Sequence, residues 1–139
     1  MQHLNTLSQL VSAASSVIEL ARSSQTYTFY VGAEVTCYVH VAGGEVRIAR
    51  HNAPMVEIAA QVQVPLGWRV AAEQDAAGVY FVALRRALLG SVANASFLVT
   101  VPLEAHLVLK LEGARLALEN VNGVLELSPQ TANLSIVPK

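Results

Sequence analysis

Four stretches near the C-terminus repeat one pattern of hydrophobic positions at a fixed spacing of nine residues. In each stretch two aliphatic residues flank a single residue, and turn-forming residues follow. Looser copies at the same spacing, Cys37-x-Val39 and Val46-x-Ile48, come earlier in the chain. Repeated short strands of this kind predict a shared β core. The four stretches are Leu107-x-Leu109, Leu116-x-Leu118, Leu125-x-Leu127 and Leu134-x-Ile136.

Hydrophobic and polar residues alternate with a period of two after Gln25, and turn signals such as Gly113 and Pro129 interrupt the alternation. Such alternation is typical of half-buried strands, so residues 26–139 are expected to form a single all-β domain of stacked short strands. Two geometries fit. In a β-solenoid-like fold each strand is one face of a coil and stacks in parallel on the coil before it. In an antiparallel meander or sandwich each nine-residue step is a strand with a tight turn, which Asn122-Gly123 favours locally. The expected strands cover 27–31, 35–41, 45–49, 56–64, 68–72, 79–84, 97–101, 106–112, 115–119, 124–128 and 133–137.

Residues 1–25 follow a different pattern and are expected to form an N-terminal helix and a linker. Apolar residues at alternating steps of three and four, including Leu7, Val11 and Ile18, predict one amphipathic helix over 6–22. A coiled coil with a second copy is one interpretation of this stripe, but the stripe is shorter than such a seam requires. Docking on the chain's own sheet or on a partner's sheet is the preferred hypothesis. Leu7, Val11 and Ile18 are therefore candidate interaction residues.

Composition narrows the class of protein. A hydrophobic fraction of 53% with a charged fraction of 14% excludes a disordered chain. The formal net charge of −1 provides no basic surface, so no nucleic-acid partner is expected. No run approaches the roughly 20 apolar residues of a membrane span, and the first residues lack the basic start of a secretory signal. The chain as given is expected to be cytoplasmic, and association with a cell surface would require it to be a fragment of a longer protein.

Residue types that carry catalysis or bind metals are scattered along the chain. The single cysteine, Cys37, excludes an internal disulfide, and its strand-like surroundings predict a small buried side chain. The four histidines lack the close spacing of a metal motif. Glu57, Glu119 and Glu126 are expected to point outward from the sheet, and nothing in the sequence selects a pair of them for glycosidase chemistry. We therefore expect no metal, no cofactor and no enzymatic activity.

Aromatic residues give one binding signal. In the expected strand over 35–41, Tyr38 and His40 should share one face, and Cys37 and Val39 should share the opposite one. An outward row of Tyr38 and His40 is typical either of a partner or sugar site or of a surface on which another element packs. The packing of the N-terminal helix is the preferred interpretation.

The C-terminal block resembles the bacterial adhesin family of β-repeat domains, best over residues 97–127. The resemblance depends on Phe97-Leu-Val-Thr-Val-Pro102, His106-Leu-Val-Leu-Lys-Leu111 and Leu116-Ala-Leu-Glu-Asn-Val-Asn-Gly-Val-Leu-Glu-Leu127. The chain departs from the family at Arg115-Leu-Ala117, where a repeat unit usually begins with glycine and valine. The resemblance implies a β-solenoid-like fold and carries over no catalytic residues.

These observations favour a non-enzymatic structural or binding module that acts through self-association or contacts with a protein partner. The expected ends of the β stack promote association unless they are covered. One alternative is a polysaccharide-acting enzyme on a β-solenoid scaffold, which needs acids that converge on one groove. The other is a polymerising bacterial scaffold protein, which would form filaments.

Overall fold

The computed structural model describes residues 22–63, 67–86, 94–120 and 123–137. The expected all-β class is confirmed. The predicted helix, with Leu7, Val11 and Ile18, lies outside the described residues, except that Arg22 begins a strand and does not end a helix. The described strands are β1 (Arg22–Tyr30), β2 (Thr36–Ala42), β3 (Glu45–His51), β4 (Met55–Gln63), β5 (Trp68–Asp75), β6 (Gly78–Arg85), β7 (Ala95–Pro102), β8 (His106–Asn120) and β9 (Gly123–Ile136).

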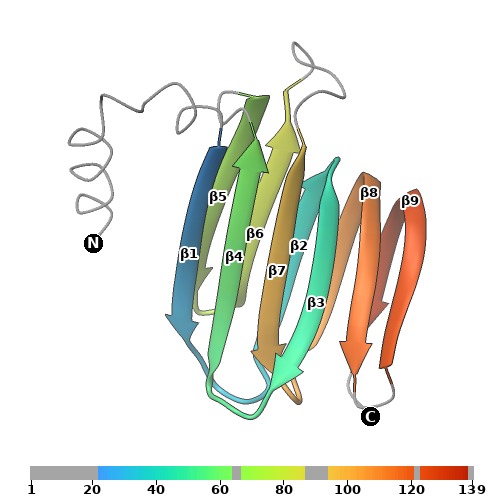
Figure 1. Cartoon of the computed structure of the whole chain (residues 1–139). Coiled ribbons are helices and arrows are strands. Elements are labelled where there is room, and N and C mark those ends of the chain that lie inside the picture. Colours follow the sequence, from blue (N-terminus) through green and yellow to red (C-terminus); the bar gives the residue numbers. More distant parts are fainter. Residues whose placement is uncertain (1–21, 64–66, 87–93, 121–122, 138–139) are drawn as a thin grey trace, which may run out of the picture.

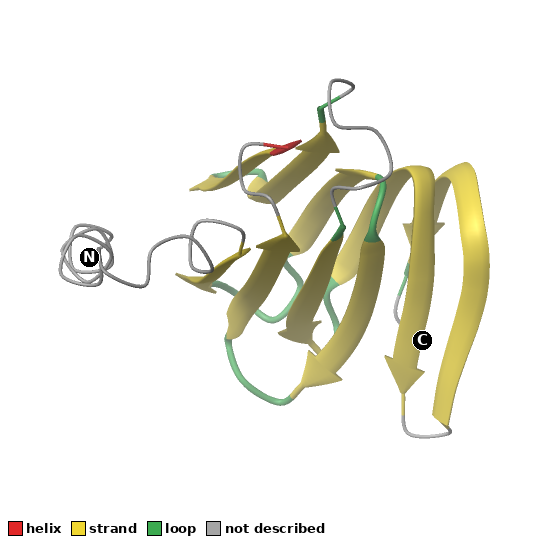
Figure 2. Cartoon of the chain, turned by 45° about the horizontal axis from the view of Figure 1, so that its top comes forward, coloured by secondary structure: helices red, strands yellow, loops and turns green. Residues whose placement is uncertain are grey.

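The strands form one sheet that is folded over on itself into two facing layers (Figure 1). The first layer contains β1, β4, β7 and β3 in this spatial order, and the second contains β5, β6 and β2. The long strand β8 belongs to both layers, because its first part pairs with β2 and its second part with β3. β9 runs antiparallel to β8 over nearly its whole length. The result is a barrel-like sheet whose layers end at β1 and β5 on the side away from β9 (Figure 2).

Glycines form the corner at which strands pass from one layer to the other. Gly43 and Gly44 lie between β2 and β3, and Gly113 lies within β8, with φ angles of 97°, 71° and 65°. The hydrogen bonds between neighbouring strands continue through this corner. The Gly43 N–H donates to the Glu112 carbonyl at 2.9 Å, and the Arg115 N–H donates to the Gly44 carbonyl at 2.9 Å. Because glycine adopts positive φ without a steric penalty, two neighbouring strands bend together here.

The nine-residue spacing separates two inward-facing positions on one bent strand. One position lies before the corner, in the second layer, and the other lies after it, in the first layer. Leu107 and Leu116 lie on β8 on either side of the corner. Cys37 on β2 pairs with Leu107, and Val46 on β3 pairs with Leu116. All four side chains are buried between the layers. The repeat therefore marks inward positions before and after the corner. The nine-residue step contains no tight turn, and β2 and β3, which one such step joins, pair in parallel with their neighbours.

The expected division of the C-terminal region into four short strands is wrong. Residues 106–112 and 115–119 belong to the single strand β8, and 124–128 and 133–137 fall almost entirely on β9. Gly113 does not reverse the chain, because it lies in a bulge where the register between β8 and β9 shifts.

The core lies between the two layers and is apolar throughout the described residues. An aromatic group joins the layers at its centre. Phe97 of β7 contacts Trp68 and Phe81 edge-on, each at 5.4 Å between ring centroids, and Tyr27 of β1 lies 6.4 Å from Phe81. Edge-to-face packing of this kind adds to the free energy gained by burying the rings.

Arg50 stabilises the end of the core opposite the corner. It lies on β3, and its Nη1 donates to the carbonyls of Pro102, Leu103 and Ala105 at 3.1, 3.0 and 2.9 Å. These carbonyls belong to the turn that connects β7 with β8, so one guanidinium fixes the passage between the two layers at that end.

Candidate functional site

A row of polar residues crosses the outer face of the first layer. Its members are neighbours in register on five adjacent strands. Side chains that alternate with Gln61, Ser96 and Arg115 are buried, so the row lies on the solvent side by the period of the strands. We call this set the polar row; it consists of Ser24 on β1, Gln61 on β4, Ser96 on β7, Glu45 on β3 and Arg115 on β8.

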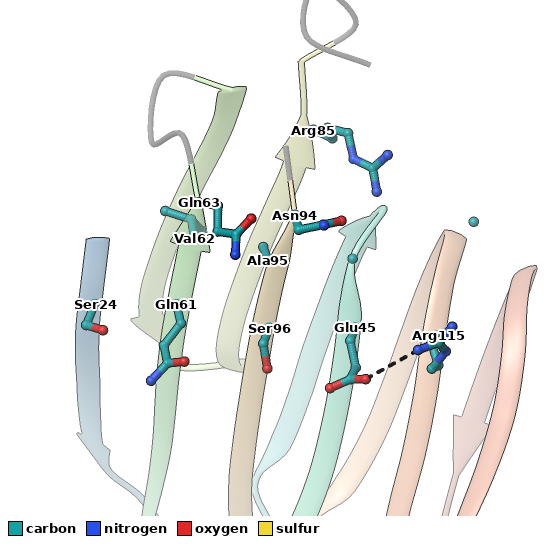
Figure 3. A pocket seen from close by; sticks show the side chains of 12 residues that line it. Ser24, Glu45, Gln61, Val62, Gln63, Arg85, Asn94, Ala95, Ser96 and Arg115 are labelled. Carbon is teal, nitrogen blue, oxygen red and sulfur yellow. Dashed lines mark ion pairs between the residues drawn. The ribbon is translucent and has the colours of Figure 1, made fainter. Parts of the chain in front are cut away.

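The polar row forms the floor of a hollow of about 750 Å³ that extends up to the corner (Figure 3). Volumes in this range are typical of ligand sites. Arg85 at the end of β6, Asn94 before β7 and Gln63 at the end of β4 line its upper part. We call it the corner hollow. The described residues of its lining provide amides, hydroxyls and three charged side chains.

Arg85 is a charged residue whose guanidinium lies at the corner. Its Cζ lies 5.6 Å from the centre of the Trp68 ring, in a cation–π arrangement. It also lies against Gly43, where an added Cβ would approach Arg85 Nε to 2.6 Å. Arg85 Nε is buried without a hydrogen-bond partner among the described residues. In contrast, Arg115 faces Glu45 at 3.8 Å, the ion pair drawn in Figure 3.

The structure places Tyr38 and His40 together on the outer face of the second layer. Their neighbours Cys37 and Val39 are buried, so the expected division of this strand between two faces is confirmed. Tyr38 stacks on Tyr80 of β6, with ring centroids 4.8 Å apart and planes inclined by 7°. These three outward side chains lie on the layer opposite to the corner hollow.

Ionisable groups surround this aromatic pair. Desolvation raises the pKa of the Tyr80 phenol, and the nearby Asp75 carboxylate raises it further. His40 Nε2 lies 2.6 Å from Glu112 Oε2 on β8. This hydrogen bond lowers the pKa of the Glu112 carboxyl group. The interpretation that the N-terminal helix packs here concerns residues outside the described part of the chain, and it stays a prediction.

Two of the acids considered for polysaccharide chemistry, Glu57 and Glu119, lie far apart. Glu57 lies on β4, which pairs with β7. β7 pairs with β3, and β3 pairs with the part of β8 that carries Glu119. Three strand spacings of roughly 4.8 Å each therefore separate Glu57 from Glu119, which exceeds the separation of glycosidase carboxylates. Glu119 is also engaged by Arg47 at 3.4 Å. Glu57 and Glu119 therefore do not form a glycosidase pair, and the side chain of the third acid, Glu126, lies outside the described part of the structure.

His40 and His51 have separate hydrogen-bond partners. His51 Nε2 donates to the Met55 carbonyl at 2.8 Å in the first layer, whereas His40 lies in the second layer. No group of three or more metal-ligating side chains occurs within 22–63, 67–86, 94–120 and 123–137.

Sequence reasoning missed the corner hollow. Arg85 and Asn94 fall in a stretch that the sequence does not assign to any element, and Glu45 and Arg115 are 70 residues apart. The sequence does contain one signal for the pairing of these strands, which is a constant offset of 70 residues between similar motifs. The offset separates Cys37-x-Val39 from Leu107-x-Leu109, and Val46-x-Ile48 from Leu116-x-Leu118. The two bent strands pair at this offset throughout, which brings Glu45 beside Arg115.

No helix in the described part of the chain is both long and apolar enough to cross a lipid bilayer. Comparisons with protein families, with curated proteins and with solved structures find no match for this chain.

Proposed function

We propose that the protein is a non-enzymatic, adhesin-like binding module that acts through self-association or contacts with a protein partner. The observation that carries this proposal is the open edge of β1, which pairs only with β4 among the described strands. An edge strand with free N–H and C=O groups is a template for adding a strand from another chain. Binding by strand addition requires no catalytic group.

Three strands end the folded sheet, and β1 lacks the features that protect the other two. β5 carries Arg69, Glu73 and Asp75 within eight residues. The sequence of β9 includes Glu126 and Pro129. Charges and proline on an edge strand disfavour pairing with a further chain. β1 begins with Arg22, but its other eight residues include no charged residue and no proline.

The register of β1 identifies the groups that would receive an added strand. The Val31 N–H donates to the Pro54 carbonyl of the neighbouring strand at 3.0 Å. In an antiparallel pair, every second residue directs its N–H and C=O groups at the partner strand, and the residues between direct theirs away from it. Val31 faces β4, so the N–H and C=O groups of Ser24, Thr26 and Thr28 point away from β4. Three such residues in succession can hold a strand of about six residues, given the two-residue repeat of the ladder.

One end of this edge is already covered from the second layer. Gln74 of β5 donates its side-chain amide to the Tyr30 carbonyl at 2.9 Å. This contact supports the register, because it requires the Tyr30 carbonyl to point outward. It also limits strand addition to the part of β1 before Tyr30.

The test replaces Thr28 by proline, which removes only an outward N–H and suits an extended edge strand. Thr28→Val is the matched control, since it keeps that N–H. Molar mass is measured by light scattering over a range of protein concentrations, and binding of a synthetic peptide with the β1 sequence, residues 22–30, is measured in parallel. We expect the wild type and Thr28→Val to self-associate or to bind the peptide, and Thr28→Pro to do neither. A wild type that stays monomeric and does not bind the peptide would contradict the proposal, whereas filaments in electron micrographs would favour the polymerising scaffold.

A further inference from the structure

Arg85 brings an uncompensated positive charge into the corner hollow. Among the described side chains, three that line the hollow are charged, Arg85, Arg115 and Glu45. Glu45 faces Arg115 at 3.8 Å, and Arg85 has no ion-pair partner among the described residues. A guanidinium with this placement is suited to a carboxylate, which it can hold through two parallel hydrogen bonds.

Two contacts hold Arg85 in place before any ligand arrives. Its guanidinium lies over the Trp68 ring at 5.6 Å, and Trp68 is itself buried. The missing side chain at Gly43 leaves the space that the guanidinium occupies. A side chain fixed in this way loses little conformational entropy on binding, which favours affinity.

The remaining polar residues of the hollow are neutral. Amide groups come from Gln61, Gln63 and Asn94, and hydroxyl groups from Ser24 and Ser96. Amides and hydroxyls both donate and accept hydrogen bonds, as the hydroxyl groups of a sugar do. A polyanion such as nucleic acid would instead need many cations along its path. The lining therefore fits a ligand with many hydroxyl groups and few negative charges.

The polar row gives this site its length. It crosses five strands, so four strand spacings of about 4.8 Å extend it to roughly 19 Å. A single sugar would occupy only part of it. The shape of the site favours a short oligosaccharide lying across the strands, with one end near Arg85.

We propose that the corner hollow binds an oligosaccharide that carries carboxylate groups, with Arg85 holding one carboxylate and the amides and hydroxyls of the floor bonding to sugar hydroxyls. The proposal does not depend on strand addition at β1. Arg85 acts as the charge-selecting residue, and the polar row positions the remaining sugars.

The test uses trigalacturonic acid as the probe and galactotriose, which lacks the carboxylates, as its neutral counterpart. Binding is measured by isothermal titration calorimetry on the full chain. We expect the acidic trisaccharide to bind and the neutral one to bind at least about tenfold more weakly, as for the loss of a charged hydrogen bond. Arg85→Gln should cause a similar loss, whereas Arg69→Gln on the exposed edge strand β5 should cause none.

Arg85 also packs on Trp68, so Arg85→Gln could unfold the protein. Ser96→Trp provides the second variant, because Ser96 is exposed on the floor of the hollow and a large side chain there fills the site. Thermal melting confirms that each variant is folded. The proposal is overturned if the wild type does not bind trigalacturonic acid, or if it binds galactotriose with equal affinity. It is also overturned if tetraglutamate binds more tightly than trigalacturonic acid, which would identify an acidic peptide as the ligand. Thr28→Pro should leave the binding of trigalacturonic acid unchanged, which separates this proposal from strand addition.

Discussion

His40 on β2 and Glu112 on β8 form a hydrogen bond of 2.6 Å across the outer face of the second layer. The two residues are diagonal neighbours, because His40 pairs in register with Lys110 and Ala42 pairs with Glu112. The hydrogen bond is the largest influence on the Glu112 carboxyl group and lowers its pKa, and the charge of Lys110 acts in the same direction. Glu112 therefore links the stability of the fold to pH.

The direction of that link follows from the lowered pKa. A carboxyl group whose folded pKa lies below its ordinary value of 4.5 stabilises the fold above that value. This contribution disappears as the pH falls through the lowered pKa. We expect Glu112→Gln to melt at a lower temperature than the wild type at pH 7, and the difference to shrink toward pH 3. Melting curves of both proteins across this range would contradict the expectation if they ran parallel.

Gly78 should tolerate substitution less well than Gly32, Gly43, Gly44 or Gly113. Its φ angle is 149°, and an added Cβ would overlap the carbonyl oxygen of Thr36 on the neighbouring strand. We expect Gly78→Ala to reduce the free energy of unfolding by about 2 kcal/mol or more, because strain and a backbone clash act together. Gly113→Asn is the control. Nothing lies within 4 Å of the added atom at Gly113, and asparagine accepts its φ of 65°, so the loss should stay below about 1 kcal/mol in urea titrations.

The residues of each strand that face the core could be predicted from the sequence, because hydrophobic and polar residues alternate along a strand and the hydrophobic ones face inward. Val39, Val46 and Leu107 are examples, and all are buried. The path of the chain between such positions could not be predicted in the same way. A glycine such as Gly113 fits a chain reversal, a bulge and a bend between layers equally well. Only the hydrogen bonds of Glu112 and Arg115 with Gly43 and Gly44, between β2 and β3, select the bend.

The same limit applies to the candidate sites. The shared face of Tyr38 and His40 follows from the period of one strand, whereas the stacking of Tyr38 on Tyr80 depends on parallel pairing of strands 42 residues apart. The corner hollow needs the register of five strands at once. The 70-residue offset in the sequence indicates only the pairing of β2 and β3 with β8, so Arg85 has no distinguishing feature until the layers are assembled.

Phe97 and the next residue, Leu98, provide a test of the alternation within β7. Phe97 is fully buried and contacts Trp68 and Phe81 edge-on, whereas Leu98 is 38% exposed on the outer face. We expect Phe97→Ala to reduce the free energy of unfolding by about 3–5 kcal/mol, as is usual for a buried aromatic residue. Leu98→Ala should change it by about 1 kcal/mol or less, since only part of the side chain is removed from contact. Equal losses in chemical denaturation would contradict the assignment of the two faces.

Cys37 lies on β2 with no exposed surface, and burial raises the pKa of its thiol to about 12. The thiolate is the reactive form, so the folded protein at pH 8 should react with Ellman's reagent only when the layers separate. We expect labelling of the native protein to be slower than labelling in denaturing urea by a factor on the order of a hundred or more. The control moves the thiol to the solvent side in the double variant Cys37→Ala and Val108→Cys, since Val108 is 38% exposed on the adjacent strand β8. If native Cys37 reacted as fast as that variant, the strand would not be held between the two layers as the register requires.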